Sequence, residues 1–208
     1  MFQDLLAGRG FTFASYAALD GELPASVDAC DGWLITGSRF GVYEGHAWIP
    51  PLEDFLRRAF AAKIPIVGIC FGHQILAQAL GGKVEKFDGG WSLGVQSYDM
   101  EGLGADTRIM AWHQDQVIEP PAEARVVGSS AFCKYAALAY GTQAYSVQPH
   151  PEFTADYVEA LVEARRAILP ADRAEAALAS LDTPLSTSLI AEKIAQVFKR
   201  RCSNKAQA

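Results

Sequence analysis

The sequence predicts a three-layer α/β fold, in which helices cover both faces of a mostly parallel sheet that carries a small antiparallel section. Two observations predict it. Short apolar runs typical of buried strands alternate with stretches whose apolar residues recur at helical spacing, and such strand–helix repeats form covered sheets. Half of the 208 residues are apolar, which is enough for a sizeable core. We expect one domain over residues 1–208.

The first part of the chain alternates between the two kinds of element. In order, the expected elements are a helix over residues 1–6, a strand at 11–16, a strand over 32–36, a helix over 48–62, a strand over 64–69 and a helix over 71–80. The helix over residues 48–62 begins with Pro50 and Pro51, which favour a first helical turn. Its apolar face consists of Leu52, Phe55, Leu56, Ala59 and Phe60.

The second part begins with strands and ends with helices. The expected strands cover residues 83–87, 95–100, 107–112, 125–130, 136–140 and 144–148, and the expected helices cover residues 155–168, 171–181 and 186–200. Ser186 or Thr187 can cap the last helix. A helical segment therefore closes the domain at about residues 155–200.

Cys70 lies between an expected strand and an expected helix, with Gly68 and Gly72 on either side. This is the strand–turn–helix pattern written G-x-S-x-G in hydrolases, with cysteine in place of serine. Glycine at the flanking positions lets strand and helix pack closely, and a helix N-terminus favours a thiolate. A cysteine in an apolar region is more often an inert buried residue, but this setting favours a nucleophile. Cys30, Cys133 and Cys202 lack the setting and are read as structural or incidental.

His150 is the best candidate base among the four histidines. It follows the expected strand over residues 144–148 and stands between Pro149 and Pro151, which keep the segment extended. Side chains two apart in an extended segment point to the same side, so Glu152 can orient the imidazole. Cys70, His150 and Glu152 thus form a candidate nucleophile, base and orienting acid. The alternative for His150 is a plain loop histidine.

Composition excludes several classes of protein. A net charge of −6 and a pI near 5.2 argue against nucleic acid or an anionic membrane as partner. No apolar run is long enough to span a membrane, and residues 1–10 lack a signal-peptide core. The four cysteines form no C-x-x-C pair, so we expect neither a metal site nor a disulfide framework. We expect a cytoplasmic enzyme without a cofactor.

Residues 68–74, followed by residues 79–82 and 147–152, resemble the class I, or triad-type, glutamine amidotransferases. The chain most resembles stand-alone domains related to the glutaminase part of GMP synthase, and the likeness runs from about residue 31 to about residue 153. The resemblance implies a flavodoxin-like fold. It also implies hydrolysis of the side-chain amide of glutamine through a thioester on Cys70.

The resemblance also assigns an oxyanion hole. Residues 31–38 are similar to the family's strand that ends in a glycine-containing loop, so the backbone N–H groups of Gly37 and Phe71 would be the two donors. Many members have two glycines at this loop. Ser38 could therefore take the place of Gly37 as donor, and it is also a candidate substrate contact.

Three further substrate contacts are implied in the same way. Gln74 matches the residue that helps to hold the substrate glutamine, and Trp91 lies in the loop over residues 90–94 that contacts the substrate's amino-acid end. His113 lies in a segment similar to the family's Ser-His-Gly-Asp, although the match is looser there. Family members begin with a strand that precedes the first helix, whereas residues 1–6 already read as that helix. We therefore expect that a first strand is missing before residue 1.

Three functions are compatible with these features. The first is a glutaminase that passes ammonia to a separate synthetase chain, because no ATP-binding G-x-x-x-x-G-K-[ST] loop is present. The second is a free-standing hydrolase of γ-glutamyl amides or peptides. The third is a non-enzymatic binding module, which the Cys70, His150 and Glu152 set disfavours. The oligomeric state stays open.

Overall fold

The computed structural model describes residues 1–205, with side chains as far as residue 199. The strands are β1 (Trp33–Ile35), β2 (Ile66–Ile69), β3 (Lys83–Lys86), β4 (Ser92–Met100), β5 (Gly104–His113), β6 (Asp115–Glu119), β7 (Ala124–Ser129), β8 (Ala137–Tyr140) and β9 (Ala144–Val147). The helices are α1 (Phe2–Leu5), α2 (Ile49–Ala61), α3 (Phe71–Ala79), α4 (Ala155–Arg165), α5 (Ala171–Ala179) and α6 (Thr187–Lys205), with a 3-10 turn η1 at Ala18–Asp20.

The main sheet has the strand order β1-β2-β9-β8-β7-β4-β5. Its β1–β2 and β2–β9 pairs are parallel, and the other described pairs of this sheet are antiparallel. The α/β class is confirmed, but the antiparallel section is larger than predicted. The reason is the length of the connections: β4 joins β5, and β8 joins β9, through three residues each, whereas a parallel pair needs a crossover connection of a dozen or more residues. Strands β3 and β6 form a separate antiparallel pair.

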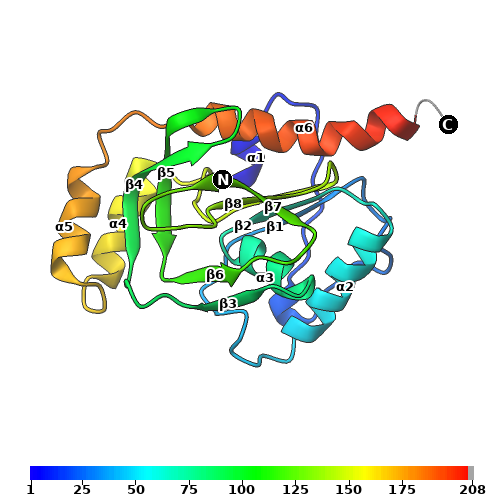
Figure 1. Cartoon of the computed structure of the whole chain (residues 1–208), viewed down its shortest axis with the longest axis horizontal. Helices are drawn as coiled ribbons and strands as arrows, with labels where there is room; N and C mark the ends of the chain where they lie inside the picture. Colours follow the sequence, from blue (N-terminus) through cyan, green and yellow to red (C-terminus); the bar gives the residue numbers. More distant parts are fainter. Residues whose placement is uncertain (206–208) are drawn as a thin grey trace.

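Helices cover both faces of the parallel part because its side chains alternate. In β2, Ile66 packs into one buried cluster with α2 and α3. Val67 and Ile69 point the other way and pack with Ile190 and Ile194 of α6. Figure 1 shows α6 along one side of the molecule and α2 and α3 on the opposite side, with α4 and α5 beside β4 and β5.

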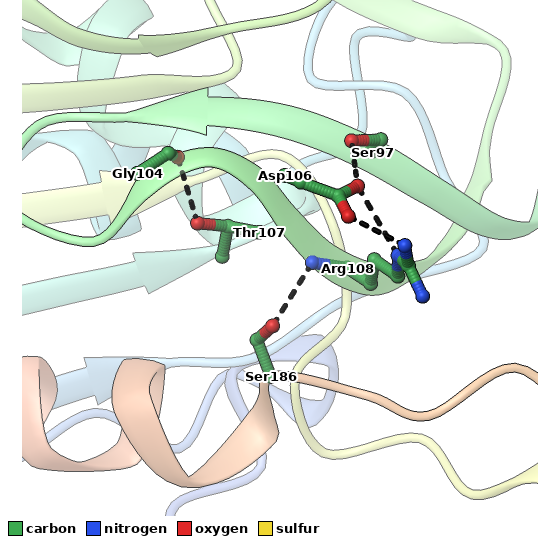
Figure 2. Close-up of polar contacts among 6 residues, drawn as sticks. All are labelled: Ser97, Gly104, Asp106, Thr107, Arg108 and Ser186. Atoms are coloured by element: carbon green, nitrogen blue, oxygen red, sulfur yellow. Dashed lines mark hydrogen bonds and ion pairs between the residues drawn. The ribbon is translucent and has the colours of Figure 1, made fainter.

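Ser186 fixes the start of α6 against β5. Its hydroxyl accepts a hydrogen bond from the backbone N–H of Arg108 at 3.1 Å (Figure 2). Its own N–H donates to the carbonyl of Arg108 at 2.8 Å. The Ser186 hydroxyl therefore binds the strand, whereas the sequence offered the hydroxyl of Ser186 or of Thr187 as the helix cap. Within the hairpin, the Asp106 carboxylate accepts hydrogen bonds from Ser97 and Arg108, which stiffens this edge (Figure 2).

Two elements differ from the sequence prediction. The strand expected at residues 11–16 is wrong, because this segment pairs with none of the strands found within residues 1–205. Its rings make contacts instead: Phe11 meets Phe198 at 5.8 Å and Tyr16 meets Trp33 at 6.0 Å between centroids. Strand β6 was not expected. Three of its five residues have charged or amide side chains, and such residues do not give the apolar pattern that predicts a strand.

Candidate active site

Cys70 occupies a strained turn between β2 and α3. Its backbone φ is +52° and its ψ is −105°, a region that side-chain-bearing residues rarely adopt. The turn is held because the Cys70 N–H donates to the carbonyl of Val147 at 2.9 Å and its carbonyl accepts from the N–H of Gln74 at 3.1 Å. The helix N-terminus thus begins directly at the thiol.

The glycines on either side of Cys70 are required by close backbone approach. A Cβ on Gly68 would lie 2.3 Å from the carbonyl oxygen of Gly72, and a Cβ on Gly72 would lie 2.1 Å from that of Ile35. Real Cβ atoms do not come so close to backbone atoms. The prediction that glycine here lets the strand and the helix pack tightly is confirmed.

His150 and Glu152 form a buried pair beside Cys70. The imidazole Nδ1 lies 2.7 Å from Oε1 of Glu152, and the two residues are only 4% and 6% exposed. The backbone N–H of His150 donates to the carbonyl of Met110 at 2.7 Å, and the ring of Phe153 stacks on the imidazole at 3.9 Å. Because Nδ1 faces Glu152, Nε2 is the nitrogen left for proton transfer.

The electrostatics of this pair favour the charged imidazole. Burial alone would lower the pKa of His150, but attraction to Cys70, together with hydrogen bonds to Cys70 and Glu152, outweighs it and raises the pKa to about 10. An imidazole that is charged at neutral pH is the partner that a thiolate nucleophile requires.

Gly37 adjoins both Cys70 and His150. It follows β1, just as Cys70 follows β2 and His150 follows β9, so all three lie at the carboxyl edge of the parallel strands. A Cβ on Gly37 would lie 2.9 Å from Cε1 of His150 and 3.8 Å from Cβ of Cys70. Phe71 is the first residue of α3, where backbone N–H groups lack partners within the helix.

A cleft of about 830 Å³ contains these residues. Of the sequence-predicted site residues, those that line it are Gly37, Ser38, Cys70, Gln74, Trp91, His113, His150 and Glu152. Phe71 does not line it, and its ring packs on Trp48 at 5.4 Å instead. The structure therefore brings the other predicted residues together, whereas the Phe71 side chain packs away from the cleft.

The side chains expected to bind substrate differ in how many of their hydrogen-bonding groups are already used within the fold. The Gln74 amide nitrogen donates to the carbonyl of Asp115 at 3.0 Å and to Oε1 of Gln148 at 3.1 Å, so both of its hydrogens are engaged within the fold. His113 is buried, and burial followed by repulsion from His150 lowers its pKa to about 3. It is therefore neutral at pH 7. Ser38 accepts a hydrogen bond from the N–H of Phe40 at 3.2 Å.

His73 lies outside the cleft, on the side of α3 that faces the sheet. It is fully buried, its Nδ1 lies 2.8 Å from the hydroxyl of Ser146, and burial lowers its pKa to about 3. This histidine therefore joins α3 to β9 in the interior of the fold.

Several cleft residues escaped the sequence reasoning. Tyr43 donates a hydrogen bond to Asp115, and both residues line the cleft. One stripe of α4, made of Tyr157, Leu161 and Arg165, lines it too. The spacing of four residues in that stripe was a usable signal, whereas nothing in the sequence pairs Tyr43 with Asp115.

No group of three or more His, Cys, Asp or Glu side chains in the described part of the chain has the arrangement of a metal site. Among residues 1–205, no helix has both the length and the apolar character needed to cross a membrane.

Cys70 on a strained turn at the edge of an α/β sheet, in one cleft with a buried histidine–carboxylate pair, matches the arrangement expected of a hydrolase-type site. Residues 22–162 match the family model "Glutamine amidotransferase class-I", so the chain belongs to this family.

The similar proteins include gamma-glutamyl peptidases and chains of GMP synthase. The chain is 29% identical over 177 residues to gamma-glutamyl peptidase 4 of Arabidopsis thaliana, covering 78% of this chain and 70% of the relative. It is 34% identical over 141 residues to the glutamine-hydrolyzing GMP synthase chain of Methanothrix thermoacetophila, covering 64% and 74%. A crystal structure of a glutamine amido transferase from Methylobacillus flagellatus superposes with a TM-score of 0.81 at 22% identity, covering 97% of this chain and 88% of that one. That similarity establishes the fold alone.

Proposed function

We propose that this protein hydrolyses γ-glutamyl amides and peptides through a thioester on Cys70. The observation that carries the proposal is the placement of Cys70 on a strained turn, in one cleft with the buried His150–Glu152 pair. The proposal therefore depends on the chemistry of these three side chains and not on the fold alone, which many unrelated functions share.

The chemistry follows from the position of each group. The Cys70 sulfur attacks the γ-carbonyl carbon, and the N–H groups of Phe71 and Gly37, or of Ser38, hold the oxyanion. Such donors are commonly worth about 2.7–4 kcal/mol each. His150 gives its Nε2 proton to the departing amine, so that the C–N bond breaks and the thioester remains.

The second half-reaction restores the enzyme. Water loses a proton to the neutral Nε2 of His150 and attacks the thioester carbon, releasing the γ-glutamyl carboxylate and the Cys70 sulfur. Glu152 holds Nδ1–H and stabilises the charged ring in both halves, in the role of a third triad member.

Two observations favour peptide-like substrates over free glutamine. The cleft extends past the three catalytic candidates along α4, which is more room than a departing ammonia needs. Four of the relatives are named gamma-glutamyl peptidases, at 26–29% identity. A second candidate is glutaminase action that supplies ammonia to a separate synthetase chain, which the similarity to the glutamine-hydrolyzing chains of GMP synthase favours.

The test is to measure glutamate release from glutamine and from γ-glutamyl dipeptides, with wild type and with Cys70→Ala. We expect wild type to turn over the dipeptides and Cys70→Ala to be inactive with an unchanged unfolding midpoint. Acid quenching of the wild-type reaction should trap a covalent adduct of γ-glutamyl mass on Cys70. Turnover of glutamine that appears only with an added synthetase would favour the second candidate. Inactivity on both classes, with Cys70 unreactive toward an electrophile, would overturn both and favour a binding module.

A further inference from the structure

The position of the departing amine is constrained by the general acid. If His150 protonates the leaving nitrogen, that nitrogen must come within hydrogen-bond reach of Nε2, at about 2.6–3.2 Å. Whatever is attached to the nitrogen then extends from the imidazole into the adjoining part of the cleft. The residues next to the imidazole therefore decide which amine can leave.

Aromatic side chains continue from the imidazole toward α4. The Phe153 ring stacks on His150 at 3.9 Å, and the Tyr157 ring meets Phe153 edge-on at 4.6 Å. Thr154 caps α4 by accepting the N–H of Tyr157 at 3.3 Å, which fixes this tyrosine on the first turn. The apolar surface beside the general acid is thus built on a fixed helix end.

Helix α4 has two distinct faces. Val158 and Val162 are fully buried against β4, β5 and α5. The other face carries Tyr157, Leu161 and Arg165, spaced four residues apart, and all three line the cleft. Tyr157 is 41% exposed, and Ile168, just beyond the helix, is 63% exposed although it lines the same cleft. This wall presents apolar surface that the fold itself does not cover.

Arg165 stands at the far end of the wall without a partner. Among the side chains described, its guanidinium makes neither a hydrogen bond nor an ion pair, whereas its neighbour Arg166 pairs with Glu163. A free guanidinium binds a carboxylate through paired hydrogen bonds. Tyr157 and Arg165 are eight residues apart, about 12 Å along the helix, and helical side chains lean back toward the N-terminus, here toward the imidazole.

We propose that Tyr157, Leu161 and Arg165 form the subsite for the amine portion of the substrate, and that they select an apolar amino acid or short peptide with a free carboxylate. Tyr157 and Leu161 hold its side chain and Arg165 holds its carboxylate. The inference rests on the proposed γ-glutamyl hydrolase function and names the substrate class for it.

Substrate series and variants test the subsite together. For wild type we expect kcat/KM for γ-Glu-Phe to exceed that for γ-Glu-Gly by about 10-fold or more, and to fall when the phenylalanine carboxylate is amidated. Arg165→Gln should lower kcat/KM for γ-Glu-Phe by about 10-fold while leaving glutamine and the amidated peptide unchanged. Leu161→Ala should lower the value for γ-Glu-Phe and spare that for γ-Glu-Gly.

The chain offers matched controls for both variants. Arg166→Gln removes the neighbouring guanidinium, which faces Glu163, and Leu189→Ala shortens an exposed leucine on α6. Both should behave as wild type. If Arg165→Gln and Leu161→Ala also behave as their controls do on every substrate, the subsite is wrong.

Binding separates this inference from the proposed function. Calorimetry of γ-Glu-Phe with the Cys70→Ala protein needs no turnover, and the same Arg165 and Leu161 changes added to it should weaken binding selectively. Selective binding without catalysis by wild type would leave the subsite standing and overturn the hydrolase. Catalysis with no preference among leaving groups would support the hydrolase and overturn the subsite. The absence of both binding and catalysis would overturn the two proposals together.

Discussion

The Tyr43 phenol donates a hydrogen bond of 2.9 Å to Oδ1 of Asp115, a residue 72 positions later in the chain. Tyr43 belongs to the loop between β1 and α2 that also carries Gly37, and Asp115 begins β6. Burial raises the pKa of Asp115, and burial together with this carboxylate raises the pKa of Tyr43. The phenol therefore stays protonated as a donor at neutral pH, and the bond joins the oxyanion-hole candidate loop to β6 at the cleft.

Removing this hydrogen bond should loosen the loop and slow the reaction. We expect Tyr43→Phe to lower kcat by about 10-fold, since one hydrogen bond to a charged group is worth about 1.5–3 kcal/mol at most, with little change in KM because the phenyl ring stays. Steady-state kinetics measure the split. Tyr16→Phe, which alters a similarly exposed tyrosine outside the cleft, is the control. A rise in KM alone would show that Tyr43 acts on substrate binding instead.

Gly37→Ala tests whether the loop after β1 must lie against the imidazole. The added Cβ would come within 2.9 Å of Cε1 of His150, so the imidazole must be displaced from its position or the loop must be pushed off it. Because misplacing a catalytic group by about 1 Å can cost about 100-fold in rate, we expect kcat to fall by that order while the unfolding midpoint stays close to wild type. Full activity in this variant would show that the ring has room to move or does not need this position.

Glu152→Gln should shift the pH dependence of activity. The carboxylate is among the groups that raise the pKa of His150 to about 10, so its removal lowers that pKa. The imidazole then loses its proton at lower pH, and the alkaline limb of the pH profile of kcat/KM moves down from about 10. Partial activity should remain, because Glu152 orients the ring and does not attack. An unchanged alkaline limb would exclude His150 as the group that titrates there.

The site was predictable where the chemistry is local in sequence. Gly68 and Gly72 surround Cys70 within five residues, and their close contacts follow from the strand–helix turn that they permit. His150 and Glu152 are two residues apart in a segment that prolines keep extended, so their contact depends on backbone geometry alone. The parallel order of β1, β2 and β9 then brings together Gly37, Cys70 and His150, which follow these three strands.

The rest depends on tertiary contacts that no short pattern encodes. The Tyr43–Asp115 bond joins a loop to a strand that the sequence did not reveal, since β6 begins with Asp115 and Gln116. Residues 11–16 read as a strand, yet among the described strands the backbone of β1 pairs with β2 alone. Their aromatic rings pack on Trp33 and Phe198 instead, an outcome that periodicity cannot separate from strand pairing.

His73 should make the protein sensitive to acid. Its pKa is lowered to about 3 in the fold by burial, against about 6.5 in an unfolded chain. Above about pH 6.5 the imidazole is neutral in both states and does not oppose folding. As the pH falls toward 3, the unfolded chain takes up the proton and the folded protein does not, so the free energy of unfolding falls. Each histidine of this kind costs up to about 1.4 kcal/mol of unfolding free energy per pH unit in that window, and His113 adds to it in the same direction. The test is to measure the unfolding free energy by urea denaturation at about pH 6 and about pH 5. Between these two pH values the free energy should fall less in His73→Asn than in wild type. The asparagine side chain can still bond Ser146. An equal fall in the two proteins would mean that His73 takes up its proton without unfolding.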